Sequence, residues 1–298
     1  MTRYFKVILA ITIFPILTFG QEDQDTTTAD VSTFSKIMNN VSGYFESNGQ
    51  WYLNDKKTGE FGEEEHVRAN SYFRLNYFFL DNFSAGIQVE SYAPEPLLNF
   101  DREFDKKVGL AQYYANYRSQ KLDVTAGYFY EQFGNGLVLR SWEDTFLGLN
   151  NSIRGGRVKY NPFDFLEVTG IYGEQRRGFD VSDSKLMAFN GEINIDNIIE
   201  SNFFDQLSLG VSFLNRNEVF ESTSEDPDRI DVPDNVYAFS GRLGIAFKNI
   251  YANAEYVYKS EDARLNNVIP NAVSYSENKL FDGCAILLNL GYSCLLYT

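Results

Sequence analysis

The sequence predicts an all-β protein: an up-and-down antiparallel transmembrane β-barrel with about 12 strands in this chain. Three observations predict it. Segment after segment alternates apolar and polar residues, the joins between segments are alternately long and short, and aromatic residues gather near segment ends. Period-2 alternation is typical of a strand with one apolar face, and alternating long and short joins are typical of an outer-membrane barrel.

The alternation is clearest in the stretch LDVTAGYFY, residues 122–130, where Leu122, Val124 and Ala126 share one phase. Similar segments follow one another from residue 40 to the end, and none of comparable length has a helical period. The expected strands cover residues 41–53, 69–80, 83–93, 108–118, 122–132, 153–160, 164–173, 186–195, 206–215, 236–247, 250–259 and 280–292.

The joins favour lipid over a soluble core as the partner of the apolar faces. Short joins such as Asp81-Asn82 and Lys248-Asn249 alternate with long ones. The expected long joins cover residues 54–68, 94–107, 133–152, 174–185, 216–235 and 260–279. An up-and-down order then places the short turns at one end and the long loops at the other. A soluble or periplasmic β-protein is the alternative, but Greek-key connections give no reason for this alternation.

Four tyrosines are predicted to form an aromatic girdle at the membrane interface. Tyr128 and Tyr130 end one strand just before a long loop, and Tyr256 and Tyr258 do so in another strand. Tyrosine rings belong at the membrane–water interface, because one edge of the ring is wet and the rest is apolar. The apolar face of residues 122–130 is therefore expected to meet lipid.

The ends of the chain predict export to the cell outer membrane. Residues 1–20, with Arg3 and Lys6 before an apolar run, are expected to be a secretory signal peptide. Residues 21–39 are polar and acidic without a period, and we interpret them as a periplasmic linker. Residues 40–298 then form the barrel. The mean hydropathy of −0.31 does not argue against this, because every second residue of a barrel strand is polar.

Charge and composition exclude several classes of function. The formal net charge of −15 argues against a nucleic-acid partner, which needs a basic face. The two cysteines, Cys284 and Cys294, would lie about 33 Å apart on one strand and could not bridge. The single histidine, His66, follows three glutamates and is expected to be a solvated loop residue. Barrel hydrolases need a Ser–His or Asp–His pair, so we expect no enzymatic activity.

Several stretches resemble an uncharacterised outer-membrane β-barrel family of bacteroidetes, which is porin-like and has no assigned activity. They are QWYLNDKKTGEF (50–61), GIQVESYAPEPLLNF (86–100), GYFYEQFGNGLVLRSWED (127–144), IRGGRVKYNP (153–162) and AEYVYKS (254–260). The resemblance runs from about residue 40 to about residue 292. It implies location and fold and transfers no catalytic residues. Members of the family are longer than this chain, which implies that this chain is truncated at its C-terminus.

The stretch 133–157 is the most informative loop, because it carries many apolar residues between glycines. A loop of this composition is not expected to extend into water. One interpretation is a pore constriction, in which Arg140, Glu143 and Asp144 lie opposite the wall residue Arg157 and set selectivity. The other is a structural cap that packs across the barrel mouth.

The polar phase of the strands predicts a lumen of mixed charge. The residues expected to face it are Arg74, Glu90, Asp123, Glu131 and Lys159. Such a lining is expected of a barrel whether or not it conducts.

One acidic segment raises the question of Ca²⁺. Asp226, Asp228 and Asp231 in the loop 216–235 carry the hard oxygen ligands that Ca²⁺ prefers, although the EF-hand spacing is missing. The alternative is a solvated acidic loop. No other cofactor is expected.

Two functions remain open at this stage. The favoured expectation is a porin-like channel or solute-uptake barrel that passes small solutes. The alternative is a structural or surface-interaction barrel that binds an unknown partner through its acidic external loops, without catalysis. Outer-membrane lipid and the barrel assembly machinery are the expected partners in either case.

Overall fold

The structure is a computed structural model that describes residues 39–53, 66–97, 107–199, 203–219, 232–264 and 279–293. The chain divides into two units, and the second, Val41–Thr298, holds all the strands described below. The predicted signal peptide (1–20) and all but the last residue of the predicted linker (21–39) lie outside the described residues. Among the described residues, no helix is long and apolar enough to cross a membrane.

Twelve strands form one antiparallel sheet in which each strand pairs with its neighbours in chain order, so the predicted strand number and up-and-down order are confirmed. The strands are β1 (Val41–Trp51), β2 (Val67–Phe79), β3 (Phe83–Ser91), β4 (Val108–Arg118), β5 (Leu122–Phe129), β8 (Ile153–Phe163), β9 (Leu166–Arg177), β10 (Asp180–Asn194), β11 (Gln206–Asn217), β12 (Asn235–Phe247), β13 (Ile250–Arg264) and β14 (Lys279–Tyr292). Two short strands, β6 (Glu143–Asp144) and β7 (Leu149–Asn150), form a hairpin of their own between β5 and β8.

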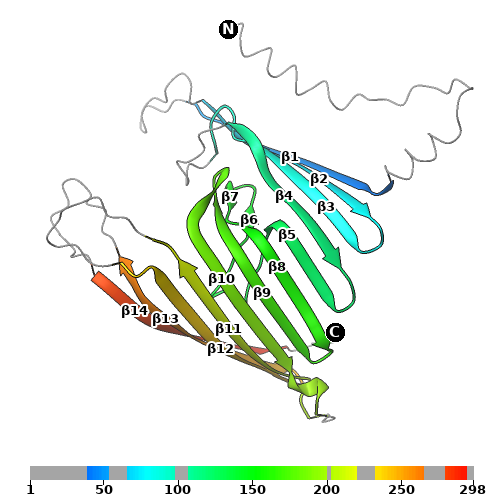
Figure 1. The fold of residues 1–298 in the computed structure, drawn as a ribbon, viewed down its shortest axis with the longest axis vertical. Helices are drawn as coiled ribbons and strands as arrows, with labels where there is room; N and C mark the ends of the chain where they lie inside the picture. The colour runs from blue at the N-terminus through cyan, green and yellow to red at the C-terminus, as the bar shows by residue number, and fades with distance from the viewer. Residues whose placement is uncertain are drawn as a thin grey trace, which may run out of the picture. The chain divides into compact units, whose positions relative to one another are not determined.

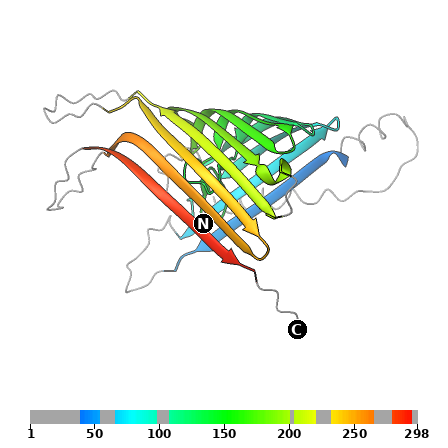
Figure 2. The same ribbon diagram turned by 90° about the horizontal axis from the view of Figure 1, so that it is seen from below.

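The sheet bends into a trough, and the β6–β7 hairpin lies on its inner, concave side (Figure 1). Figure 2 shows the same curvature from below, with β1 and β14 as the two edges. Among the described residues, β1 pairs only with β2 and β14 only with β13. The described sheet is therefore open along two edges.

The two faces of the sheet differ because side chains alternate along each strand. On the convex face, Phe189, Phe213, Phe239 and Tyr258 form one row across β10 to β13, and the rings of Phe213 and Phe239 lie 5.1 Å apart. On the concave face, the corresponding row is polar and buried. It consists of Thr169, Asn190, Ser212 and Ser240.

Aromatic rings gather on the convex face at the short-turn end. Phe79 and Phe83 flank the β2–β3 turn with ring centroids 5.6 Å apart, and Phe83 continues the contact to Tyr117 on β4 at 4.8 Å. Phe163 and Phe165 stack in the same way at the β8–β9 turn. Offset stacking of this kind adds to the area that the rings bury.

The prediction of a long loop at 174–185 is wrong. Residues of this segment extend β9 and β10, and Arg177 pairs directly with Asp180 across the two-residue turn Gly178–Phe179. Gly178 adopts a φ of 59°, which glycine reaches without the strain of a side chain. The pairing shifts between Val181 and Lys185, and this bulge masks the strand alternation in the sequence.

Gly127 lies where two strands approach each other closely. Its φ is 106°, and a Cβ there would lie 2.3 Å from the carbonyl oxygen of Tyr113 on β4. It pairs with Gly155 on β8, which in turn pairs with Gly173 on β9. A row of glycines allows neighbouring backbones to approach closely where a side chain would separate them.

Replacing Gly127 by Ala is therefore expected to destabilise the sheet by about 1–3 kcal/mol, the usual cost of a strained backbone position. The measurement is the urea midpoint of the detergent-folded protein, with boiled and unboiled samples compared on a gel. Gly156→Ala is the matched control, because nothing lies within 4 Å of a Cβ at that position. Equal midpoints for the two variants would contradict this account.

Candidate functional site

The segment that links β5 to β8, residues 130–152, folds back onto the concave face; we call it the inward loop (Figures 1 and 2). Its first part is held by a bridge between Gln132 and Arg140, and its second part is the β6–β7 hairpin. This stretch packs against the concave face of the sheet and does not extend into water, as its apolar composition predicts.

An apolar cluster anchors the first part of the inward loop. Phe133 and Leu139 of the loop are buried with the wall residues Phe129, Ile153 and Ile171. Many positions on the concave face are polar, but Ile171 aligns with Ala188 and Leu214 across β9, β10 and β11. The wall is therefore apolar where the apolar part of the loop rests on it.

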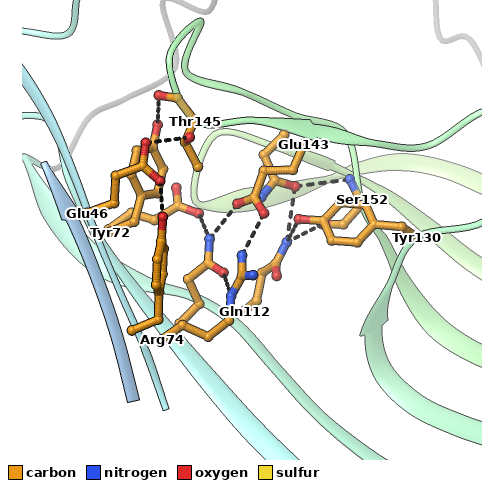
Figure 3. A network of polar contacts seen from close by, with 12 residues as sticks. Glu46, Tyr72, Arg74, Gln112, Tyr130, Glu143, Thr145 and Ser152 are labelled. Carbon is orange, nitrogen blue, oxygen red and sulfur yellow. Dashed lines mark hydrogen bonds and ion pairs between the residues drawn. The ribbon is translucent and has the colours of Figure 1, made fainter. Parts of the chain in front are cut away.

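A polar network anchors the β6–β7 hairpin to β2 and β3, as Figure 3 shows. Glu143 receives hydrogen bonds from Arg74 Nη2 and from Gln88 Nε2, both at 2.6 Å. The Arg74 Nε in turn donates to Gln88 Oε1 at 2.7 Å. Glu143 thus holds the hairpin against two wall residues by charge-assisted bonds, which are stronger than neutral ones.

Further bonds tie the loop to β1, β2 and β4 (Figure 3). The Thr145 hydroxyl donates to Glu46 at 2.8 Å, and the Tyr72 hydroxyl donates to the Thr145 carbonyl at 2.9 Å. On β4, the Gln112 amide donates to the Tyr130 hydroxyl at 2.6 Å and to Ser152 Oγ at 3.0 Å. The inward loop therefore contacts four adjacent strands, β1 to β4, beginning at the edge of the sheet.

The tip of the inward loop reaches the other side of the trough. Both the backbone N–H and the side-chain amide of Asn135 donate to Glu255 Oε2 on β13, at 3.1 and 2.8 Å. The neighbouring Gly134 lies against Arg242 on β12, and any side chain at Gly134 would collide with that guanidinium. Arg242 also bonds Glu192 on β10 at 3.1 Å.

A fully buried ion pair joins β3 to β9 above this network. Arg176 donates to both carboxylate oxygens of Glu90, at 2.9 and 2.7 Å, and the side chains are 1% and 0% exposed. The Tyr92 hydroxyl and the Gln88 amide also donate to Glu90, at 2.6 and 2.8 Å. Because Gln88 also bonds Glu143, one continuous network joins the ion pair to the inward loop.

The five residues predicted to face a lumen lie on the concave face, and the lumen itself stays a prediction. Arg74 and Glu90 take part in the contacts above, and the other three gather around Arg157. Arg157 pairs with Asp123 and Glu131 at 3.3 and 3.2 Å, and Lys159 pairs with Glu131 at 2.8 Å. All of them lie on the concave face.

The predicted opposition of Arg140, Glu143 and Asp144 to Arg157 is wrong. Only Glu143 forms an ion pair with the wall, and its partner is Arg74. Arg140 is exposed and lies over the Trp142 ring at 5.3 Å, and Asp144 accepts a bond from the Leu147 N–H within the hairpin. The hairpin lies against β2, whereas Arg157 on β8 pairs with Asp123 on β5 and with Glu131 at the start of the inward loop.

Of the four tyrosines of the predicted girdle, Tyr130 lies on the opposite face from the others and Tyr128 is buried, and the girdle itself stays a prediction. Tyr256 and Tyr258 are exposed on the convex face, and Tyr128 packs edge-to-face on Tyr113 there. Tyr130 instead bonds Gln112 on the concave side, because β5 ends at Phe129 and alternation no longer sets the direction of the next side chain. Burial raises the pKa of the Tyr130 phenol above its ordinary value, so the group remains neutral.

The predicted Ca²⁺ ligands and the single histidine are the remaining candidate residues. Asp226, Asp228 and Asp231 lie outside the described residues. Within the described ranges, no three His, Cys, Asp or Glu side chains gather in a way that could hold a metal ion. His66 precedes β2, and its Nδ1 lies 2.9 Å from the Tyr52 carbonyl oxygen.

A cavity of about 570 Å³ lies on the concave face between the inward loop and the β2–β3 turn. Its wall includes inward-facing side chains of β2, β4 and β8. Among them are Arg74, Asn76, Gln112, Tyr114, Arg118 and Arg157.

Sequence reasoning did not identify Arg176 or Asn135 as structural residues of the site. Arg176 stood in the expected loop 174–185, and Asn135 stood in a loop with no period. The apolar wall positions carried a usable signal, because Ile171 and Leu214 interrupt the polar phase of their strands.

The chain belongs to the family described as "Family of unknown function (DUF6029)", whose match spans residues 4–295. No curated protein matches the chain. Among solved structures, it is similar to one described as "NanC porin structure in rhombohedral crystal form", with 9% identity and a TM-score of 0.32 over 85% of this chain and 98% of that one. A similarity at this level carries no argument about function. The expectation that the family is a bacteroidete one stays a prediction.

Arg176→Met is expected to lower the free energy of unfolding by about 3–5 kcal/mol, because it leaves the Glu90 carboxylate buried without its counter-charge. Urea titration of the detergent-folded protein measures this. The double variant Glu90→Leu with Arg176→Met should recover much of the loss, because it removes both charges.

Lys107→Met is the control for this prediction, since it breaks the exposed pair between Lys107 and Glu95. That change should cost at most about 1 kcal/mol. A loss for Arg176→Met no larger than for Lys107→Met would show that the buried pair does not hold β3 and β9 together.

Proposed function

We propose that the protein is an outer-membrane β-barrel that acts as a porin-like channel or solute-uptake barrel, and that the inward loop is its constriction. The observation that carries the proposal is the placement of this loop. Residues 130–152 lie across a polar concave face and are held to strands on both sides of the trough. A segment in this place narrows whatever lumen the curved sheet encloses.

The convex face supports a lipid environment. Its exposed side chains are largely apolar, with aromatic rings stacked at the short-turn end and tyrosines toward the long-loop end. Lipid offers no hydrogen bonds to the free edges of β1 and β14, so the proposal requires that the barrel close on itself or through further strands. Export by the predicted signal peptide and insertion by the barrel assembly machinery belong to the same proposal.

The concave face supports passage of small polar solutes. It combines carboxylates, guanidinium groups and amides, and such linings set the ion selectivity of pores. The proposal includes no catalytic step and no cofactor, and the predicted Ca²⁺ site at Asp226, Asp228 and Asp231 remains untested.

A structural or surface-interaction barrel is the second candidate, and one observation favours it. The Glu90–Arg176 pair and its network are buried, so this part of the trough is filled by side chains rather than by solvent. A sealed lumen would leave the external loops, including the acidic segment 216–235, as the binding surface.

Single-channel recording in planar bilayers tests the first candidate. Glu143→Gln removes the ionic contact between the inward loop and Arg74, so it is expected to change the conductance and the cation-to-anion permeability ratio. Lys248→Gln is the control outside the loop: it also removes one charge, but at the turn between β12 and β13. We expect it to leave both quantities nearly unchanged.

Folding is checked first, by the gel shift between boiled and unboiled samples of each variant. A folded wild-type protein that does not conduct would reject the channel and favour the second candidate. Unchanged conductance and permeability ratio in Glu143→Gln would keep the channel but reject the inward loop as its constriction.

A further inference from the structure

Three charged side chains form a row on the largely apolar convex face; we call them the charged row. Arg154 on β8 pairs in register with Glu174 on β9, and Glu174 pairs with Lys185 on β10. Arg154 Nη2 donates to Glu174 Oε2 at 2.6 Å, and the Lys185 ammonium contacts the other oxygen, Oε1. Two positive charges thus share one negative charge, so the row is cationic overall.

The charged row stands alone on these three strands. Between it and the short-turn end, the outward positions of β8, β9 and β10 carry no charged residue, and all of them lie within the described part of the chain. The large side chains among these positions are apolar or aromatic and exposed: Val158, Tyr160, Tyr172, Met187 and Phe189. The row is therefore the polar upper edge of an apolar surface.

The charged row lies at the depth expected for lipid headgroups. Arg154 is the second residue of β8, and Phe163, nine residues later, is its last residue at the short-turn end. That separation corresponds to about 30 Å along a strand, or about 23 Å across a membrane for a strand tilted by about 40°. The apolar band of a barrel is about 25 Å tall, so the row and Phe163 fall at its two edges.

A cavity of about 360 Å³ adjoins the charged row on the convex face; we call it the outer hollow. The three charged side chains line it together with Tyr113 and Tyr172, which are 46% and 60% exposed. The paired glycines Gly155 and Gly173 form part of its lining, so no side chain fills that part of it. Tyrosine rings of this kind suit the boundary between headgroups and lipid chains.

The cations are the accessible charges of the row. Glu174 is 17% exposed, whereas Arg154 and Lys185 are 39% and 47% exposed. An ammonium has three N–H donors and a guanidinium has five, and the contact with Glu174 uses one donor of each. Because both cations contact the same carboxyl group, they are close enough to each other to donate to one tetrahedral phosphate.

We propose that the outer hollow binds the phosphate group of an anionic membrane lipid. Arg154 and Lys185 hold the phosphate, and Tyr113 and Tyr172 contact the adjoining part of the lipid. Charge complementarity and the depth of the row both support this occupant, because a lipid continues from its phosphate onto the apolar surface beneath. The inference rests on the proposed function for the lipid around the convex face, and not on conduction.

Native mass spectrometry of the full chain, folded in detergent, tests the proposal with an equimolar mixture of dioleoyl phosphatidylglycerol and dioleoyl phosphatidylcholine. The two lipids have the same chains, but only the first has a net negative charge. The protein is expected to retain phosphatidylglycerol about fivefold over phosphatidylcholine, the effect of one net positive charge near a lipid surface. Excess inorganic phosphate at constant ionic strength should leave this ratio in place, because the free ion lacks lipid chains.

Variants of one lysine locate the binding. Lys185→Gln removes the net positive charge of the row, so it is expected to lower the ratio about fivefold, to nearly equal retention. Lys185→Arg should preserve the ratio. Lys107→Gln is the matched control: it also removes an exposed lysine that pairs with a glutamate, Glu95, but it lies before β4 and outside the outer hollow. It should leave the ratio unchanged, and the gel shift checks the folding of each variant.

Equal retention of the two lipids by the folded wild-type protein would overturn the proposal, and so would an unchanged ratio in Lys185→Gln. Loss of the preference in inorganic phosphate would show a site for free anions and would also reject a lipid site. Flotation with phosphatidylcholine vesicles separates these results from the proposed function. A protein that inserts but shows no preference rejects this inference alone, whereas a protein that does not insert rejects the lipid-facing barrel itself.

Discussion

Buried polar groups on the concave face need partners, and the rest of the structure depends on how the inward loop supplies them. Arg74 donates to Glu143 of the loop, and Gln112 donates to the Tyr130 hydroxyl. On the opposite wall, Glu255 accepts from the amide of Asn135. An unpaired buried polar group costs far more than a paired one gains, so each of these contacts restricts where the loop can lie. The apolar cluster around Phe133 adds burial, but the polar contacts determine the position.

The alternation of the sequence made the sheet predictable, because a strand with one apolar face repeats every second residue whatever it packs against. It also assigned Arg74, Glu90 and Asp123 to one phase, and these three side chains share the concave face. It could not choose their partners: Arg157 and Glu143 share the concave side, yet each pairs with a different side chain. The pattern also fails where backbone geometry changes, as at Tyr130 after the end of β5 and at the bulge in β10.

The Glu90–Arg176 pair shows why partners are harder to predict than faces. The two residues are 86 positions apart and lie on strands that are not neighbours in the sheet. A contact between such distant residues leaves no periodic pattern in the local sequence. Ion pairs of this kind contribute little net stability compared with apolar packing, but they strongly disfavour any arrangement that separates the two charges. Here that preference fixes the approach of β3 to β9 across the trough.

The span of the inward loop has a consequence for how the chain reaches its native state. From one short segment, Thr145 contacts Glu46, 99 residues earlier, and Asn135 contacts Glu255, 120 residues later. Contacts of such long sequence separation form slowly, because the intervening chain must first be ordered. The loop can complete both sets only after strands near both ends of the sheet are in place. The loop is thus expected to dock late in folding, after the strands that it contacts have paired.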